Sequence, residues 1–409
     1  MTKGRDTKPH IGIFGRRNNG KSSLINCLTG QETAIVSEVP GTTTDPVKKS
    51  IEIEGIGPAV VIDTAGIDDT GELGLKRIRR SKDMLDLIDL AILVITENIF
   101  DEPEKELITD FRKHEVPFVV VYNKSDLVKA EKKLTSVIHG RYAVPVIEFS
   151  ARFPGNLEEI ILAIRETMPE TAYRKRPLVG DLISYGDVVL LITPIDIEAP
   201  EGRMILPQVQ VIRDVLDHDG VVVICKEREV DAFIRTMNPK PVLVITDSQV
   251  FPKADAAVPK DIPLTSFSIV LARQKGDFEH YRKGTPYISK LKDGDRVLIL
   301  ESCSHHVSCD DIGRIKIPRW ISNFTGKKLE FTTVAGLDRI PGEITDYAMV
   351  IQCGSCMITR KQLISRLRPA VEAGIPVTNY GMAIAYVHGI YNRAIAPFDK
   401  GGDGRADYI

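Results

Sequence analysis

The chain has 409 residues, a net charge of -2 and 6 cysteines. This length predicts two to four domains with substantial buried cores. The near-neutral charge, without a dense Lys/Arg block, gives no electrostatic reason to expect binding to nucleic acid or to an anionic membrane. No apolar run reaches the length of about 18 residues that a membrane span needs, and residues 1–10 are polar. We therefore expect no membrane span, no signal peptide and a cytoplasmic location.

The first part of the chain alternates short aliphatic runs with helix-length segments between His10 and Met168. This alternation predicts a doubly wound α/β domain over residues 1–172. A charged stretch with a proline at residues 173–177 predicts a linker after it. The strands are expected at 11–14, 59–62, 90–95, 118–122 and 144–149.

Two further α/β domains are predicted after the linker, over residues 178–258 and 264–409. In the second domain, nearly all-apolar strands are expected at 188–192, 221–225 and 242–245, as in sheets buried on both faces. So small a sheet leaves an edge exposed, which favours pairing into a homodimer or docking on a neighbouring domain. A loose stretch at 251–263 is expected to mark the next boundary. The third domain is predicted to have strands at 296–300, 329–333, 348–351 and 376–378, helices at 266–283, 314–324 and 361–373, and a loose tail at 400–408.

Residues 15–22 read Gly-Arg-Arg-Asn-Asn-Gly-Lys-Ser, between the first predicted strand and a helix that begins near Ser23. This pattern predicts a phosphate-binding loop. Its glycines allow backbone amides to surround phosphates, Lys21 supplies a positive charge to the β and γ phosphates, and the Ser22 hydroxyl ligates Mg2+. The nucleotide-binding residues expected here are Asn18, Asn19, Gly20, Lys21, Ser22 and Ser23.

The sequence Asp-Thr-Ala-Gly at residues 63–66 follows the predicted strand 59–62. We expect the Asp63 carboxylate to lie near the magnesium ion and the Gly66 amide to contact the γ phosphate. Together with Lys21, Gly66 is therefore a predicted catalytic residue. Loss of the γ phosphate on hydrolysis would release the Gly66 contact.

A second loop is predicted to recognise the base. Asn123, Lys124 and Asp126 belong to an Asn-Lys-Ser-Asp sequence that ends the strand 118–122. An aspartate there can accept two hydrogen bonds from guanine but meets mismatched groups on adenine. Ser150 and Ala151 supply a further loop over the base. The four motifs together predict a GTPase that converts GTP to GDP.

This first domain resembles the TrmE/Era branch of the translation-factor GTPases. Residues 41–45, Gly-Thr-Thr-Thr-Asp, resemble the switch I sequence of that branch, which implies that Thr43 is a catalytic residue and the second hydroxyl on Mg2+. Asn18 matches the asparagine that is associated in such relatives with a K+ ion in place of an arginine finger. Ile67 stands where Ras-like proteins have a water-orienting glutamine, so we expect slow hydrolysis that a cation or partner stimulates.

Three cysteines near the C-terminus follow two predicted strands of one domain. Cys303 follows the strand 296–300, while Cys353 and Cys356 follow the strand 348–351. The carboxyl ends of parallel strands share one edge of a sheet, where ligands bind. The three thiols are therefore expected to converge.

The residue chemistry alone leaves the nature of this site open. A zinc site could be completed by His305, His306 or Cys309, whereas an iron-sulfur cluster could use three thiolates and an exchangeable fourth ligand. A redox pair of cysteines is a third reading. Cys27 and Cys225 are expected to be small buried hydrophobic residues.

The cysteine pattern resembles the HydF family, the maturation GTPases and scaffolds of [FeFe]-hydrogenase. Cys303 and His305 match Cys-x-His, and about 46 residues later Cys353 and Cys356 match the family's Cys-x-x-Cys. The resemblance covers essentially the whole chain and implies a [4Fe-4S] cluster held by the three cysteines, with His305 as a possible fourth ligand. Gln352 departs from the family, which usually has histidine at that position.

The resemblance also implies a cargo and partners. The cluster would hold a di-iron H-cluster precursor, made by radical-SAM maturases, for delivery to apo-[FeFe]-hydrogenase. Because glutamine is a poor iron ligand, His305, Glu301, Asp310 or a solvent molecule remain candidates for the fourth position. The alternative is an RNA-modification or ribosome-assembly GTPase with a C-terminal zinc site, although neither a KH-like Gly-x-x-Gly loop set among basic residues nor an aromatic-rich basic face supports RNA binding.

Overall fold

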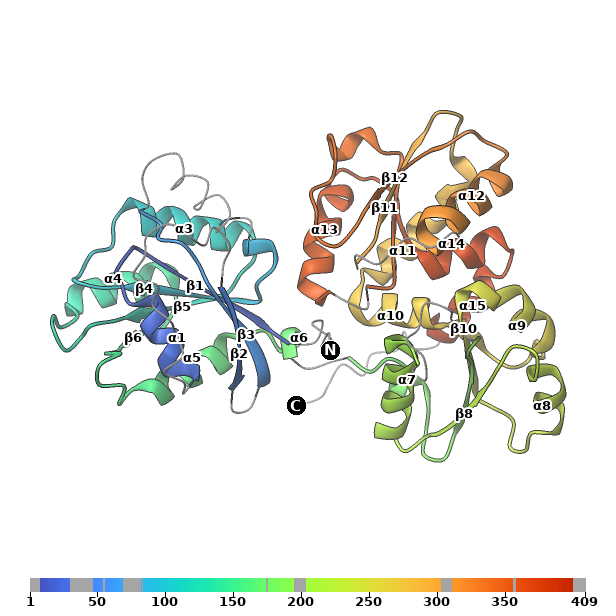
Figure 1. The fold of residues 1–409 in the computed structure, drawn as a ribbon, viewed down its shortest axis with the longest axis horizontal. Helices are drawn as coiled ribbons and strands as arrows, with labels where there is room; N and C mark the ends of the chain where they lie inside the picture. The colour runs from blue at the N-terminus through green and yellow to red at the C-terminus, as the bar shows by residue number, and fades with distance from the viewer. Residues whose placement is uncertain are drawn as a thin grey trace. The chain divides into compact units, whose positions relative to one another are not determined.

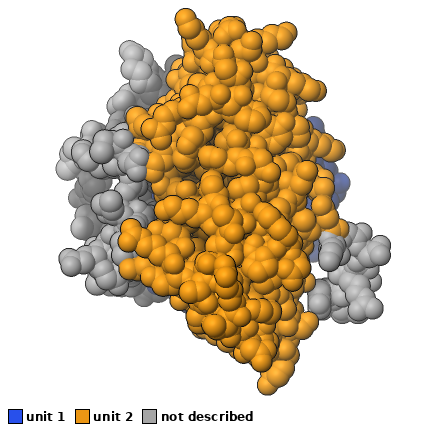
Figure 2. All heavy atoms as spheres, turned by 90° about the vertical axis from the view of Figure 1, so that its right-hand side faces the viewer, with its two compact units in different colours: residues 1–175 blue, residues 176–409 orange. Residues whose placement is uncertain are grey.

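The structure is a computed structural model that describes residues 8–29, 47–53, 56–68, 82, 84–173, 176–194, 204–302, 311–355 and 358–399. The chain divides into two compact units, residues 1–175 and 176–409, coloured separately in Figure 2. The boundary between the two units lies between residues 175 and 176. Figure 1 labels the helices and strands.

Unit 1 is built on a six-stranded sheet with the order β2-β3-β1-β4-β5-β6. Its pairings are parallel except for β2 with β3. The strand order reverses beside β1, which is where ligands bind in open α/β sheets. The predicted doubly wound fold is confirmed. The strands are β1 His10–Gly15, β2 Val47–Ile53, β3 Gly57–Asp63, β4 Leu90–Ile95, β5 Phe118–Tyr122 and β6 Val146–Glu148.

Helices cover both faces of this sheet (Figure 1). Leu24 of α1 and Ile160 of α5 belong to the core on one face, and Phe111 of α3 and Ile138 of α4 to the core on the other. The central strands are therefore fully buried, which explains their all-apolar sequences. The helices are α1 Lys21–Thr29, α3 Glu102–Lys113, α4 Lys132–Tyr142, α5 Leu157–Thr167 and α6 Glu170–Tyr173.

Unit 2 contains two four-stranded parallel sheets, of which the first has the order β10-β9-β7-β8. β7 is wholly buried, but β8 forms an edge, and Val221 and Ile224 on it are 48% and 43% exposed. The expectation that all these strands are buried on both faces is therefore wrong for β8. This sheet consists of β7 Val188–Ile192, β8 Val221–Cys225, β9 Leu243–Thr246 and β10 Leu264–Ser266, with helices α7 Leu206–Asp217, α8 Val230–Thr236 and α9 Phe251–Ala257.

The stretch 251–263 is not uniformly loose, because its first half forms α9. Pro252 lies in the first turn of this helix, where the missing N–H donor has no intrahelical partner to lose. β10 pairs with β9, so the expected boundary between residues 258 and 264 falls between two paired strands of one sheet.

The second sheet of unit 2 has the order β12-β11-β13-β14. One core connects both sheets and includes Val211 of α7, Leu271 of α10 and Leu300 of β11, which explains why they form one compact unit. The helix expected at 266–283 is two helices, α10 and α11. The elements are β11 Arg296–Leu300, β12 Glu330–Val334, β13 Met349–Gln352 and β14 Val377–Asn379, with α10 Phe267–Lys275, α11 Phe278–Gly284, α12 Ile317–Thr325, α13 Arg360–Glu372, α14 Tyr380–Val387 and α15 Tyr391–Asp399.

The division into three domains stays a prediction, and the tail 400–408 lies outside the described residues. Among the helices that the structure describes, none combines the length and the apolar composition needed to cross a membrane.

Candidate functional site

Two glycines shape the predicted phosphate-binding loop. Gly15 ends β1 at φ +146°, where a Cβ atom would lie 2.3 Å from the carbonyl oxygen of Val94. Gly20 has φ +83°, and a Cβ atom there would lie 2.3 Å from Nδ2 of Asn123. The turn between β1 and α1 therefore requires glycine both for its backbone conformation and for close contact with neighbouring loops.

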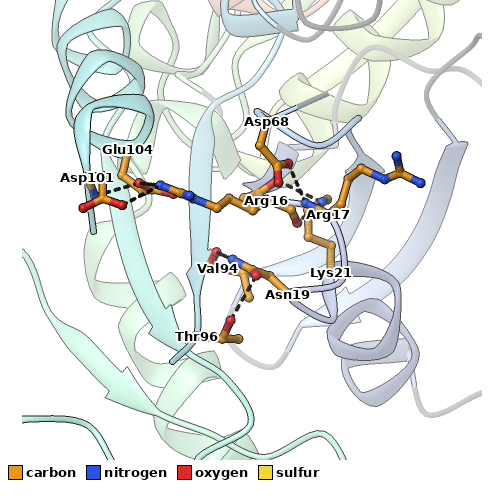
Figure 3. A network of polar contacts seen from close by, with 10 residues as sticks. Arg16, Arg17, Asn19, Lys21, Asp68, Val94, Thr96, Asp101 and Glu104 are labelled. Carbon is orange, nitrogen blue, oxygen red and sulfur yellow. Dashed lines mark hydrogen bonds and ion pairs between the residues drawn. The ribbon is translucent and has the colours of Figure 1, made fainter. Parts of the chain in front are cut away.

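Asn19 fixes this loop to its surroundings (Figure 3). It is buried, its Nδ2 donates to the Val94 carbonyl oxygen at 2.9 Å, and its Oδ1 accepts from the Thr96 hydroxyl at 3.0 Å. Nδ2 of Asn123 donates to the Asn19 carbonyl oxygen at 2.9 Å. The Asn19 side chain, predicted to contact the nucleotide, thus connects the loop to the end of β4, and Asn123 connects it to the guanine-recognition loop.

Arg16 forms an ion pair with helix α3, as Figure 3 shows. Its Nε and Nη2 donate to Oε1 and Oε2 of Glu104 at 2.7 and 2.9 Å, and its Nη2 lies 3.2 Å from Asp101 Oδ2. The hydrogen bonds with Glu104, which is 1% exposed, raise the pKa of Arg16. The backbone N–H of Arg17 donates to Asp68 Oδ1 at 2.8 Å. Sequence reasoning missed these contacts because the pattern leaves both arginine positions variable.

The predicted magnesium ligands that the structure describes lie together. The Ser22 hydroxyl donates to Asp63 Oδ2 at 2.7 Å, while Asp63 Oδ1 is buried and has no hydrogen-bond partner among the described residues. Burial raises the pKa of Asp63, and the bond from Ser22 opposes this shift. Nζ of Lys21 donates to the Gly15 carbonyl oxygen at 2.9 Å. A hydroxyl beside a carboxylate oxygen fits Mg2+, which prefers oxygen ligands. Thr43 lies outside the described residues.

The guanine-recognition residues come together from two loops. The Ser150 hydroxyl donates to Asp126 Oδ1 at 2.6 Å, and the Ala151 N–H donates to Asn123 Oδ1 at 3.2 Å. Asp126 is exposed, and Lys124 has φ +58°. The Asp126 carboxylate is thus held by a neighbouring loop while its surface remains open to a base.

Four other residues named in the sequence prediction lie in the phosphate-binding loop or in the segments that contribute to the nucleotide site. Asn18, at φ +60°, and Ser23 are exposed. Gly66 is buried, and a Cβ atom there would lie 2.6 Å from Cγ of Arg17. Ile67 is half-buried and its side chain packs against the core of unit 1. An aliphatic side chain cannot orient a water molecule, so this position offers no substitute for glutamine.

At the C-terminal cysteine site, β11 and β13 are adjacent and parallel, so their carboxyl ends share one edge. The backbone N–H of Ser302 donates to Cys353 Sγ at 3.1 Å, and that of Ser355 does so at 3.4 Å. Ser302 immediately precedes Cys303 in the sequence, so the last described residue before Cys303 contacts Cys353. Cys303, His305 and Cys356 themselves lie outside the described residues.

Gln352 belongs to the hydrogen-bonded group that surrounds Cys353. It is fully buried, and its Nε2 donates to the hydroxyls of Ser302 and Ser355 at 3.0 and 3.1 Å and to Cys353 Sγ at 3.6 Å. Its Oε1 is buried without a partner among the described residues. N–H donors around a sulfur fit a thiolate that ligates an iron-sulfur cluster, because such bonds stabilise its negative charge. Gln352 therefore supports the Cys353 sulfur.

Charged side chains flank the same edge. Glu301 is 2% exposed and forms an ion pair with Arg314, with the closest contact at 2.9 Å. Arg366 donates to the carbonyl oxygens of Glu301 and Val334 at 2.6 and 2.9 Å. Burial lowers the pKa of Arg366, and the charge of Cys353 opposes this shift. Glu301, a candidate fourth iron ligand, is thus engaged by Arg314 in this structure.

No group of three metal-ligating His, Cys, Asp or Glu side chains occurs in the part of the chain that the structure describes, and four of the predicted metal ligands, Thr43, Cys303, His305 and Cys356, lie outside it. Cys27 and Cys225 pack against cores, but they are partly exposed and not buried as expected. Burial still raises the pKa of both thiols, that of Cys225 to about 11.

Family models match three consecutive parts of the chain. Residues 10–124 match a 50S ribosome-binding GTPase, residues 178–276 match the hydrogen maturase F dimerization domain, and residues 279–397 match the hydrogen maturase F tetramerization domain. The chain belongs to the hydrogen maturase F family. In this hydrogen maturase F chain the GTPase match lies in unit 1, and the two maturase domains lie in unit 2.

Curated relatives match the GTPase part. The tRNA modification GTPase MnmE of Heliobacterium modesticaldum is 38% identical over 160 residues, which are 37% of this chain and 33% of the relative. GTPase Der of Kosmotoga olearia is 33% identical over 163 residues, 37% of each chain. The chain thus spans about a third of the length of these relatives.

Solved structures include Aquifex aeolicus Era bound to GDP.AlF4-, with a TM-score of 0.37 and 18% identity over 57% of this chain and 99% of Era. The G domain of the T. maritima FeoB iron transporter has a TM-score of 0.32 and 23% identity over 39% of this chain and 98% of that domain.

Proposed function

We propose that this hydrogen maturase F chain is a GTP-hydrolysing scaffold in [FeFe]-hydrogenase maturation. It holds a [4Fe-4S] cluster and a di-iron H-cluster precursor, which it delivers to apo-hydrogenase. The observation that carries this proposal is the contact between Cys353 Sγ and the N–H of Ser302 at 3.1 Å. That contact joins the loop that leads into Cys303 to the Cys-x-x-Cys loop, in a chain that matches both hydrogen maturase F domains.

In the proposed GTP site, Lys21 contacts the β and γ phosphates, and Ser22 and Thr43 ligate Mg2+, with Asp63 beside them. Asp126 recognises guanine. The close contact of the Ser22 hydroxyl with Asp63 Oδ2 at 2.7 Å supports a magnesium site here. The magnesium ion would neutralise charge on the phosphates as the γ phosphate leaves.

Hydrolysis is proposed to be slow and stimulated by K+. Ile67 offers no polar group to the attacking water. Asn18 is exposed at φ +60°, and the structure shows no side-chain hydrogen bond of Asn18 within the described ranges, so its amide oxygen is available to a cation. A comparison of GTP turnover in K+ and Na+ buffers tests this, because equal rates would refute K+ stimulation.

The cluster is proposed to be held by Cys303, Cys353 and Cys356, with His305 or solvent at the fourth iron. When bound, the cluster would supply an iron with an exchangeable coordination position, which can receive the di-iron cargo. Gln352 supports this assignment as a hydrogen-bond donor around Cys353.

The proposed partners are radical-SAM maturases, apo-hydrogenase and a second copy of the chain, in the cytoplasm. The match to a dimerization domain supports the homodimer. The β8 edge supports it too, because Val221 and Ile224 expose apolar surface on a strand that pairs on one side only among the described strands.

Sequence similarity to the tRNA modification GTPase MnmE favours a second candidate, an RNA-modification GTPase with a structural zinc ion at the cysteines. Metal analysis separates the two candidates. Stoichiometric zinc without iron after anaerobic reconstitution would favour the RNA-modification GTPase.

Two matched variants test the division of labour in the proposed scaffold. Lys21→Ala should abolish GTP turnover, because it removes the charge that contacts the phosphates, and should leave iron content unchanged. Cys353→Ser should lower iron content and leave GTP turnover unchanged. Loss of both properties in either variant would contradict separate sites for nucleotide and cluster.

A further inference from the structure

The last turn of α10 contacts the segment that enters unit 2 from unit 1. Arg273 donates to both carboxylate oxygens of Asp181, from Nη1 at 2.9 Å and from Nη2. Gln274 donates from Nε2 to the carbonyl oxygen of Arg176 at 2.6 Å. Arg176 is the first residue of unit 2, so α10 binds the chain directly after the peptide bond that joins the units.

The same segment is held on its other side by helix α7. Oδ2 of Asp214 accepts hydrogen bonds from the consecutive backbone N–H groups of Leu178, Val179 and Gly180, at 3.0, 2.8 and 2.8 Å. One carboxylate oxygen thus fixes three residues of the entering segment. Residues 176–181 are therefore held by both α7 and α10, so a displacement of this segment would act on both helices.

The next residue of α10 holds the cysteine loop instead. Lys275 is 7% exposed, and its Nζ donates to the carbonyl oxygens of Ser355 and Ile358 at 3.1 and 3.3 Å. In the sequence these two residues stand on either side of Cys356. A buried ammonium group carries a desolvation cost, which its hydrogen bonds to the loop offset. Lys275 therefore contacts both ends of the segment that carries a proposed cluster ligand.

Arg360 connects the cysteine loop to the end of α10 a second time. Its Nη1 donates to the carbonyl oxygens of Lys275 and Gly276 at 2.9 and 3.0 Å, which satisfies acceptors at the helix C-terminus. Burial lowers the pKa of Arg360, and the positive charge of Arg176 lowers it further. Arg360, the first residue of α13 after the cysteine loop, is thus close enough to Arg176 of the entering segment for their charges to interact.

We propose that the last turn of α10, residues 273–276, couples the segment entering from the GTPase unit to the described parts of the cysteine loop, residues 353–355 and 358, with Lys275 as the positioning residue. This inference rests on the proposed function, since it assigns a route by which the nucleotide state acts on the cluster site. Figure 1 shows α10 between the two sheets of unit 2, whose shared core includes Leu271 of this helix. A shift of the last turn of α10 imposed by the entering segment therefore moves Lys275 and its contacts with the cysteine loop.

The test measures the reactivity of the Cys353 thiol in the cysteine loop. It uses full-length, cluster-free protein kept under anaerobic conditions. The alkylation rate of Cys353 by iodoacetamide is followed by peptide mass spectrometry, with GDP or with a non-hydrolysable GTP analogue bound. In the wild type the two nucleotides should give rates that differ about fivefold, the lower end of common coupling between sites. Equal rates in the wild type would overturn the coupling.

Three variants separate coupling from simple support of the fold. Lys275→Met should bring the two rates within about 1.5-fold of each other, since the hydrogen bonds to both carbonyl oxygens are lost. Asp181→Asn, at a partly exposed ion pair, should reduce the ratio as well. Lys283→Met on α11, an exposed lysine, should keep the wild-type ratio.

If Lys275 only supported the fold, the result would differ. Lys275→Met would then raise the Cys353 alkylation rate with either nucleotide and preserve the ratio of the two rates, which would overturn the proposal. The fluorescence of Trp320 in unit 2 verifies folding, and Asp181→Asn decides the question if Lys275→Met does not fold. Because the measurement uses cluster-free protein, absence of iron after reconstitution would refute the proposed cluster without changing this outcome.

Discussion

The ion pair between Arg16 and Glu104 should contribute strongly to the stability of unit 1. Glu104 is 1% exposed, whereas the Arg16 side chain is 22% exposed. Removing one partner of a fully buried pair costs about 3 to 5 kcal/mol. Glu104 would keep a hydrogen bond from the Asp101 N–H at 2.9 Å, so Arg16→Met should lower the free energy of unfolding by about 2 kcal/mol.

A double-mutant cycle isolates the pair. Glu104→Gln should cost about 1 kcal/mol, since Arg16 can still contact the exposed Asp101 and solvent. The double variant should be more stable than the sum of the single effects predicts, by about 1 kcal/mol. Lys113→Met, an exposed lysine of α3, serves as the control.

The assay must report on unit 1 alone. The single tryptophan, Trp320, lies in unit 2, so its fluorescence does not follow this unit. Hydrogen exchange of the α3 peptide 102–113 over a urea series measures the opening free energy directly. A change below about 0.5 kcal/mol for Arg16→Met, or strictly additive effects, would refute this account of the ion pair.

Three other outcomes are expected. Gly20→Ala should abolish nucleotide binding, because residue 20 has φ +83° and the added Cβ would collide with the Asn123 side chain. Binding is measured with a fluorescent GDP analogue. The control Gly140→Ala, whose Cβ would meet open space, should bind normally. Burial and the charge of Lys48 lower the pKa of His10 to about 4. As the pH falls, His10 is therefore protonated in the unfolded state before it is protonated in the folded state. The free energy of unfolding of unit 1 should decrease by about 3 kcal/mol between pH 6.5 and pH 4. His10→Gln should remove this pH-dependent decrease in stability, whereas His139→Gln, at an exposed position, should not. A His10→Gln variant whose stability depends on pH as in the wild type would contradict this role of His10. Gln352→Leu should destabilise unit 2 by about 2 kcal/mol, because the buried hydroxyls of Ser302 and Ser355 lose a hydrogen-bond partner. Urea titrations monitored by Trp320 fluorescence measure this change. Wild-type stability of the variant would contradict the role of Gln352 in the hydrogen-bonded group around Cys353.

The sequence predicts the buried strands well, because their apolar runs are bounded by turn residues. β4, β5, β7, β8 and β11 begin and end where the sequence predicts. β2 is missed because Lys48 and Lys49 interrupt its apolar alternation, and it forms an antiparallel edge. α9 is missed because Pro252 is typical of loops as well as of a first helical turn, although the alanines of this segment favour a helix.

The site is predictable only where local sequence determines its chemistry. The roles of Gly15 and Gly20 can be predicted, because a phosphate-binding loop needs the backbone conformation that glycine adopts. The hydrogen bonds of Asn19 and Gln352, and the buried Lys275, depend on contacts between segments far apart in the chain. No local pattern distinguishes such a lysine or glutamine from one on the surface, so only the fold reveals them.

The cluster is the central claim, and electron paramagnetic resonance tests it most directly. After anaerobic reconstitution with iron and sulfide and reduction with dithionite, the wild type should show the signal of a reduced [4Fe-4S] cluster. The triple variant Cys303→Ser, Cys353→Ser, Cys356→Ser should show none while still hydrolysing GTP. An unchanged signal in the triple variant, or stoichiometric zinc without iron in the wild type, would contradict the account.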